Sequence, residues 1–199
     1  MLRPHDLLQL NDYRLGGDAP EWARSAITKA PWVVVRRAAT EPGTVATGIR
    51  GSDRSQRYAT TVPVGAVAQV VTPEQLSTRN THARNLPAMH ALWRVSPDLD
   101  RLGLPWGPTG SVGFELATGE PTVTAASDLD LVVRVDRLAS STLQHLSHVA
   151  ALLAAAPVRV DCQVETRYGA VALAEVSNRE VLVRTADGPR LMALLDGAP

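Results

Sequence analysis

The first eighty residues alternate short apolar runs with polar turns, a pattern typical of a small mixed domain. Residues 32–36 carry three consecutive valines, which predict a strand covered on both faces. Residues 20–30 begin with a proline and predict a helix, and Thr72-Pro73-Glu74 has the capping residue, proline and early acid of a second helix start. Further strands are expected at residues 45–50, 58–62 and 67–71, after a short apolar segment at residues 3–10.

Beyond residue 80 the pattern predicts a longer mixed sheet. Residues 84–94 and the alanine-rich residues 140–155 predict helices, and the prolines and glycines of residues 96–110 predict a constrained loop. Strands are expected at residues 111–117, 122–125, 129–135, 158–166, 170–175 and 181–185. The sequence therefore predicts an α+β fold, with a small N-terminal α+β domain at residues 1–80 and a second domain at residues 81–199.

Composition narrows the classes of partner. Twenty basic residues balance twenty acidic ones, so no global positive field would hold a nucleic-acid polymer. Cys162 is the single cysteine and no basic segment with an apolar leader opens the chain, so a cytoplasmic protein is expected. The longest apolar stretch, residues 149–158, is too short to cross a bilayer. We therefore expect neither a nucleic-acid nor a membrane partner.

Two carboxylates stand two positions apart at a predicted strand. Asp128 and Asp130 would project from one face, while Leu129 and Leu131 enter the core. Two unpaired carboxylates repel, whereas a magnesium ion favours both in the ionised state. An isolated Asp-x-Asp motif is more often a pair of solvated acids, so the surrounding sequence decides its meaning.

Two further features accompany the acid pair. Gly110-Ser111 lies upstream, and a Gly-Ser turn lets backbone N–H groups and a hydroxyl approach phosphate oxygens. Downstream, strand alternation places Asp161 and Glu165 on one face of residues 158–166. Asp161 can join the acid pair if this strand lies beside the first, which makes Asp128, Asp130 and Asp161 candidate ligands for Mg²⁺.

This order of motifs resembles the catalytic signature of the DNA polymerase beta nucleotidyltransferase superfamily. The resemblance implies a nucleotidyltransferase-like mixed β-sheet with flanking helices for residues 81–199. The superfamily usually continues from Gly-Ser into a helix, whereas the apolar alternation of residues 112–116 and the turn at Gly119 predict a strand here.

A closer resemblance covers nearly the whole chain. Residues 104–119, followed by Ser127-Asp128-Leu129-Asp130-Leu131, resemble the phosphoribosyl-dephospho-CoA transferases of malonate decarboxylase. The opening at residues 3–8 resembles the family's Arg-His-Asp-Leu, with Pro4 inserted after Arg3. The other segments that resemble the family are residues 48–57, 160–166, 169–175 and 184–189.

The family resemblance implies a specific reaction. The phosphoribosyl-dephospho-CoA group of 2'-(5''-triphosphoribosyl)-3'-dephospho-CoA would pass to a serine of the decarboxylase's acyl-carrier subunit, with release of diphosphate. Asp128 and Asp130 match the family's catalytic pair. Asp161 is then a candidate third metal ligand or base for the serine, and Gly110 and Ser111 would hold the leaving phosphates.

Other residues carry weaker signals. Arg50, Arg54 and Arg57 could bind the triphosphate or an acidic carrier protein, but on spacing alone a solvated basic loop is equally expected. His5 could assist catalysis, although a histidine near a terminus is more often a surface residue. The spacing of His145 and His148 fits metal ligands on one helix face, but a solvent-facing surface is the expected role.

Cys162 and Trp106 also invite functional interpretations. Cys162 alternates with the apolar face of its strand, which predicts a buried, inert thiol and not a nucleophile. Trp106 lies between Pro105 and Gly107 and could stack on a nucleobase, although packing of the proline-rich loop is the expected role.

Two alternative functions remain open on the sequence. One is a nucleotidyltransferase that modifies a protein or small molecule with an ordinary nucleoside triphosphate. The other is an inactive module that retains the fold and binds a carrier protein. A binding assay that compares different triphosphates would distinguish the general nucleotidyltransferase from the family's reaction. Carrier binding that does not depend on a metal would indicate the inactive module.

Overall fold

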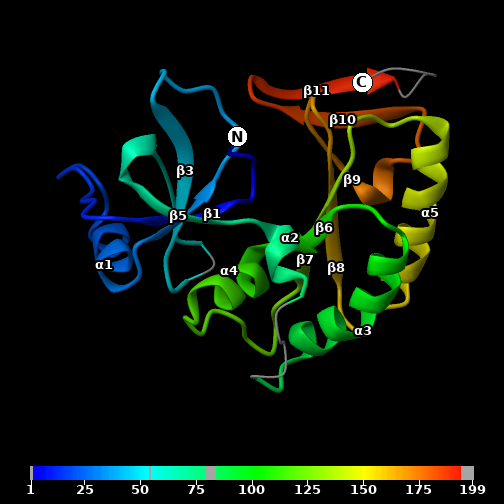
Figure 1. The fold of residues 1–199 in the computed structure, drawn as a ribbon, viewed down its shortest axis with the longest axis horizontal. Helices are drawn as coiled ribbons and strands as arrows, with labels where there is room; N and C mark the ends of the chain where they lie inside the picture. Colours follow the sequence, from blue (N-terminus) through cyan, green and yellow to red (C-terminus); the bar gives the residue numbers. More distant parts are fainter. Residues whose placement is uncertain (1, 54, 79–83, 194–199) are drawn as a thin grey trace.

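Two β-sheets lie side by side, and short helices fill the space between them (Figure 1). The computed structural model describes residues 2–53, 55–78 and 84–193. Both sheets combine with helices, so the α+β class predicted from the sequence is confirmed. The expected domain boundary near residue 80 lies outside the described residues and stays a prediction.

The first sheet is antiparallel throughout and has the strand order β4-β3-β2-β1-β5. Helix α1 (Glu21–Lys29) packs on it, burying Ala23 and Ile27 against Leu8 and Val33. Helix α2 (Pro73–Leu76) follows the last strand and has the capping box of Thr72 and Gln75. The strands are β1 (Leu7–Leu10), β2 (Trp32–Val35), β3 (Thr44–Arg50), β4 (Arg57–Pro63) and β5 (Val67–Val71), with a 3₁₀ turn at Val64–Ala66.

The second sheet has the order β11-β10-β9-β8-β7-β6, in which β7 and β8 are parallel and the other neighbours antiparallel. Helices α3 (Pro87–Arg101) and α5 (Ser140–Ala154) cover one face, as Figure 1 shows on the right. The strands are β6 (Trp106–Pro108), β7 (Leu129–Arg134), β8 (Val160–Glu165), β9 (Ala170–Ala172), β10 (Glu180–Thr185) and β11 (Gly188–Ala193), with a 3₁₀ turn at Leu173–Glu175.

The core of the second sheet shows which of its two faces is covered by helices and which is available for a functional site. Leu129, Leu131 and Val133 of β7 pack with Cys162 and Val164 of β8 in the core that α3 and α5 complete. Because side chains alternate along a strand, the residues between them face the other way, toward the first sheet. The second sheet therefore presents a polar face at the boundary between the two sheets.

The strand expected at residues 111–117 is wrong, because this segment is helix α4 (Gly110–Thr118). The helix is buried on several sides, including consecutive residues from Ser111 to Glu115, so it shows no periodic polar face. It ends at Gly119, which takes a left-handed conformation. The Gly-Ser turn thus runs into a helix, as it usually does in the superfamily.

The strand expected at residues 122–125 is also wrong. That segment is irregular and is held by hydrogen bonds to a side chain and a backbone carbonyl of α4. The Val123 N–H donates to Glu115 Oε2 at 2.8 Å, and the Thr122 hydroxyl donates to the Ser111 carbonyl at 2.9 Å. These bonds replace the ladder that a strand would need.

The loop expected at residues 96–110 is largely a helix and a strand. Helix α3 continues through Pro97 to Arg101, and β6 follows. Pro97 is exposed, while Leu92, Val95 and Leu99 keep helical spacing on the buried face. Burial of these side chains offsets the hydrogen bond that the proline removes.

The remaining expectations differ mainly at their ends. The helix expected at residues 84–94 begins at Pro87, and the strand expected at residues 170–175 turns into a 3₁₀ segment after Ala172. Strand β11 was not expected, because its exposed residues do not alternate between apolar and polar. Among the described residues, no helix has the length and apolarity needed to span a membrane.

Candidate active site

Asp128 and Asp130 lie at the start of β7, where the chain enters the second sheet. Asp130 is the second residue of the strand, and Asp128 immediately precedes it. Leu129 and Leu131 on either side are almost fully buried, as the alternation predicted. The strand therefore anchors both carboxylates on the face that points away from α3 and α5.

Asp161 joins this site through the pairing of the two central strands. Strands β7 and β8 are parallel, and Asp130 and Asp161 are direct partners in their register. The sequence prediction that Asp161 lies beside the acid pair is therefore correct. Its carboxylate is half-exposed and pairs with Arg159, whose Nη2 lies 3.2 Å from Asp161 Oδ1.

The three carboxylates affect one another electrostatically. Burial raises the pKa of the Asp130 carboxyl, and the negative charges of Asp161 and Asp128 raise that pKa further. The positive charges of Arg50 and Arg57 act in the opposite direction. Asp130 thus lies where acids of the second sheet meet arginines of the first.

The described carboxylates do not yet form a compact metal centre. In residues 2–53, 55–78 and 84–193, no three His, Cys, Asp or Glu side chains gather closely enough to hold a metal ion. Asp161 is instead paired with Arg159 of the same strand region. The expected metal site of Asp128, Asp130 and Asp161 therefore stays a prediction.

Gly110 lies directly against Asp130. Its φ of +58° is a left-handed conformation, and a Cβ at this position would come within 1.8 Å of Asp130 Oδ2. The Thr109 N–H also donates to the Asp130 carbonyl at 2.8 Å. The first turn of α4, with its unpaired N–H groups, therefore begins beside the acid pair, while the adjoining Ser111 is buried.

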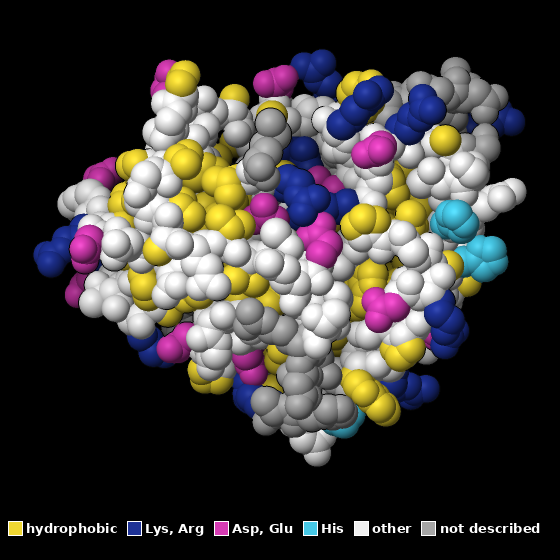
Figure 2. All heavy atoms as spheres, in the orientation of Figure 1, with side chains coloured by type: hydrophobic (Ala, Val, Ile, Leu, Met, Phe, Trp, Pro, Cys, Tyr) yellow, Lys and Arg dark blue, Asp and Glu magenta, His cyan; other side chains and the backbone are white. Residues whose placement is uncertain are grey.

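A cavity of about 530 Å³ opens between the two sheets, and two arginines of its lining, Arg50 and Arg57, are those whose charges act on Asp130. Arg50 and Arg57, two of the three arginines expected to bind substrate, line it, while Arg54 lies outside the described residues. Figure 2 shows basic side chains gathered in the hollow between the two halves, with acidic ones beside them. The arginines that line the cavity are Arg36, Arg37, Arg50, Arg57 and Arg184.

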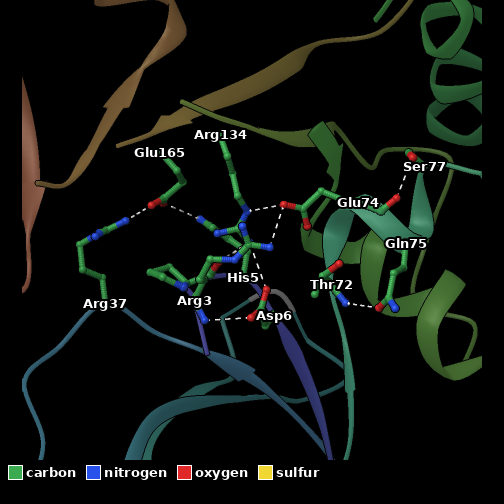
Figure 3. A network of polar contacts seen from close by, with 11 residues as sticks. Arg3, His5, Asp6, Arg37, Thr72, Glu74, Gln75, Ser77, Arg134 and Glu165 are labelled. Atoms are coloured by element: carbon green, nitrogen blue, oxygen red, sulfur yellow. Dashed lines mark hydrogen bonds and ion pairs between the residues drawn. The ribbon is translucent and has the colours of Figure 1, made fainter. Parts of the chain in front are cut away.

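His5 and Glu165 form the inner wall of the same cavity. His5 Nε2 lies 3.3 Å from Glu165 Oε1, and Arg37 pairs with the other oxygen of Glu165 (Figure 3). Burial, together with the positive charges of Arg134 and Arg37, lowers the pKa of His5 to about 4. His5 is therefore neutral at pH 7, with one ring nitrogen that donates and one that accepts a hydrogen bond.

A buried ion network fastens the two sheets beside this wall. Arg134 of β7 reaches Asp6 at 3.1 Å and Glu74 at 2.8 Å, and Arg3 also pairs with Glu74 (Figure 3). Arg134 Nη2 also donates to the Pro4 carbonyl at 3.0 Å. The network fixes the segment that carries His5 against the second sheet.

Sequence reasoning missed several residues of this site. Arg37 and Arg134 had no motif around them, and Arg184 lay in a segment that resembles the family but was given no role; the positions of all three become clear where the two sheets meet. Glu165 did carry a signal, since alternation placed it on the same strand face as Asp161. What the alternation could not show is that this face meets His5 of the first sheet.

The other candidates fall outside the site. Cys162 is buried, and burial raises the pKa of its thiol to about 12, so the prediction of an inert thiol is confirmed. Trp106 is buried and its Nε1 donates to Asp100 Oδ1 at 2.9 Å, which confirms its packing role. His145 and His148 are exposed on α5, as the expected solvent-facing surface requires.

Comparison with known proteins agrees with the architecture of two sheets. Residues 3–73 match the family model described as the phosphoribosyl-dephospho-CoA transferase MdcG N-terminal domain, and residues 75–194 match the corresponding C-terminal domain. No solved structure matches the chain.

Several curated relatives are similar over nearly their full length. A phosphoribosyl-dephospho-CoA transferase of Pseudomonas putida is 42% identical, with 99% of this chain and 98% of the relative covered. Proteins with the same description are 44% identical in Pseudomonas fluorescens (strain Pf0-1), over 86% of this chain and 82% of the relative, and 40% identical in Azotobacter vinelandii, over 96% and 92%. The chain therefore belongs to the phosphoribosyl-dephospho-CoA transferase family of enzymes.

Proposed function

We propose that this enzyme transfers the phosphoribosyl-dephospho-CoA group of 2'-(5''-triphosphoribosyl)-3'-dephospho-CoA to a serine of the malonate decarboxylase acyl-carrier subunit, releasing diphosphate. The observation that carries the proposal is that Asp130 and Asp161 are direct partners on adjacent strands and that Arg50 and Arg57, which line an arginine-rich cavity, act electrostatically on Asp130. Acids that hold a cation and arginines that hold phosphate are the two requirements of phosphoryl transfer.

Mg²⁺ is the cofactor that fits these residues. Burial and the negative charges of Asp161 and Asp128 raise the pKa of Asp130, and a divalent cation would offset that excess of negative charge. Asp128, Asp130 and Asp161 would hold the ion once Asp161 leaves Arg159. When bound, Mg²⁺ would neutralise negative charge on the phosphate oxygens.

The arginines and the Gly-Ser turn would bind the triphosphate. Arg50 and Arg57 act on Asp130 and line the cavity, so a phosphate chain held by them would lie beside the carboxylates. The first turn of α4 at Gly110 and Ser111 offers N–H groups to the leaving phosphates. Bidentate guanidinium contacts would orient the α phosphorus toward the incoming serine.

The transfer itself needs a proton acceptor. The serine oxygen forms a bond to the α phosphorus, the bond from that phosphorus to the bridging oxygen of diphosphate breaks, and the serine proton must leave. Asp161 is our candidate base, because it is half-exposed and lies beside Asp130 in the register of the strands.

The single cysteine is buried and reduced, which suits a reaction in the cytoplasm.

Intact mass of the carrier subunit tests the proposal. The carrier is incubated with the enzyme, Mg²⁺ and triphosphoribosyl-dephospho-CoA, beside a reaction with ATP and a carrier whose acceptor serine is alanine. We expect a mass gain equal to phosphoribosyl-dephospho-CoA with the first donor and the serine-bearing carrier. A gain with ATP alone would instead indicate a general nucleotidyltransferase, and carrier binding without any gain an inactive module.

A further inference from the structure

A second cavity between the two halves has a different chemical character. It measures about 730 Å³ and lies between α1 and the connection from α4 to β7. Trp22, Trp32 and Phe114 contribute three aromatic rings to its walls. The first cavity holds five arginines, whereas the cations lining this one are Lys29 and Arg50. The second cavity therefore suits a flat, weakly charged group.

The aromatic cavity is connected to the acid site on two sides. Arg50 lines both cavities, and its charge acts on Asp130. On the opposite wall, Thr122 lines the aromatic cavity and donates its hydroxyl to the carbonyl of Ser111, next to Gly110. A ligand that reaches from the arginines into this cavity would thus pass the acid site.

We propose that the aromatic cavity binds the adenine ring of the donor's dephospho-CoA part, an inference that rests on the proposed function. In that donor the triphosphoribosyl group is attached to the 2'-oxygen of the adenosine, so the purine lies within two sugars of the α phosphorus. Purines stack on aromatic side chains, and Ser52 and Gln56 add hydroxyl and amide groups that can bond the polar edge of the ring.

An ion pair closes the rim of the aromatic cavity. Lys29 of α1 and Glu120 of the α4–β7 connection pair at 2.5 Å, so one partner comes from each side. Both residues are at the surface, and the pair can separate and re-form at little energetic cost.

Helix α1 offers a matched pair of variants. Ser25 and Thr28 are both exposed on this helix, and Ser25 lines the cavity, whereas Thr28 is not part of its lining. Ser25→Trp should fill the cavity without disturbing the core, and Thr28→Trp adds the same bulk elsewhere. Circular dichroism and thermal unfolding check that both variants fold.

Isothermal titration calorimetry with AMP, dephospho-CoA and 4'-phosphopantetheine is the binding test. We expect Ser25→Trp to weaken AMP and dephospho-CoA at least tenfold, and Thr28→Trp to leave both within twofold. AMP should also quench tryptophan emission of the unmodified enzyme. Loss of 4'-phosphopantetheine binding with unchanged AMP binding would assign the cavity to the pantetheine arm and overturn the inference, as would unchanged binding of all three probes.

Kinetics with the complete donor separate this inference from the proposed reaction. We expect Ser25→Trp to raise the KM for the donor at least tenfold while kcat stays near that of the unmodified enzyme. Carrier modification with an unaltered KM would sink the adenine site and leave the reaction standing. AMP binding that Ser25→Trp abolishes, without any carrier modification, would support the adenine site and sink the reaction.

Discussion

At the scale of single residues, opposing electrostatic effects act on the ionisation of Asp130. Burial and the neighbouring carboxylates disfavour its charged form, while Arg50 and Arg57 favour it. Strongly perturbed pKa values are typical of functional sites, because a charged group that costs stability where it lies is usually kept for its role in binding or catalysis. Asp161 was predicted correctly as a neighbour because strand alternation and parallel pairing follow simple rules, whereas the ion pair with Arg159 depends on side-chain packing.

His5 gives a prediction about pH. Its pKa is lowered from 6.5 to about 4, so the unfolded chain binds more protons than the folded one between these values. The stabilising effect is complete above about pH 6.5 and is lost as pH falls toward 4. The groups that act on His5 are Arg134, Arg37, Asp130 and Asp6, together with Glu165 in contact with its ring.

Replacement of the imidazole isolates this effect. His5→Asn tolerates the left-handed backbone at φ +72° and cannot titrate. We expect the unmodified protein to lose about 2 kcal/mol more stability than His5→Asn between pH 6.5 and 4. Urea unfolding at a series of pH values measures the difference, and parallel curves for the two proteins would contradict the prediction.

At the scale of elements, helix α4 determines the shape of the site. Its sequence predicted a strand because residues 112–116 alternate and a turn follows at Gly119. A helix enclosed on several sides has no polar stripe that would identify it as a helix. By contrast, α1, α2, α5 and β7 were predicted well, since each has a cap, a proline or a regular apolar pattern. The secondary structure of the other segments depends on contacts between parts of the chain that are far apart in the sequence.

Two glycines at the ends of α4 separate strain from function. Gly110 and Gly119 both have positive φ, but a Cβ would meet Asp130 at Gly110 and open space at Gly119. Gly119→Ala should cost about 1 kcal/mol of stability and leave transfer nearly intact. Gly110→Ala should cost more and reduce transfer at least a hundredfold, because it displaces the acid. Equal activity of the two variants would exclude the predicted role of the turn.

At the scale of the whole molecule, the site depends on how the two sheets meet. Arg134 lies buried between Asp6 and Glu74, and its loss would remove the buried cation that both acids share, leaving Glu74 with the more exposed Arg3. We expect Arg134→Met to lower the free energy of unfolding by about 3 kcal/mol. Arg101→Met, which breaks the exposed pair with Asp98, should cost less than about 1 kcal/mol. Denaturant unfolding of both variants decides whether the buried network stabilises the junction.

The contact between the two sheets could not be predicted from the sequence. Most strands of the first sheet and the central strands β7 and β8 of the second could be anticipated from their apolar patterns, whereas β6 and β11 could not. The motif at Asp128 and Asp130 indicated the acid site. The arginine cavity and the aromatic cavity arise where segments far apart in the sequence face each other, such as Arg37 with Glu165 and Lys29 with Glu120. No local pattern encodes those pairings.

The central claim is that Asp128 and its partners transfer phosphoribosyl-dephospho-CoA to a carrier serine. The most direct measurement is the intact mass of the carrier after reaction with the unmodified enzyme, with Asp128→Asn, and with Asp187→Asn, whose side chain lies exposed at the tip of the β10–β11 hairpin. We predict the full mass gain with the first and third enzymes and less than a hundredth of that rate with Asp128→Asn, whose fold should be intact. Near-normal modification by Asp128→Asn would contradict the account.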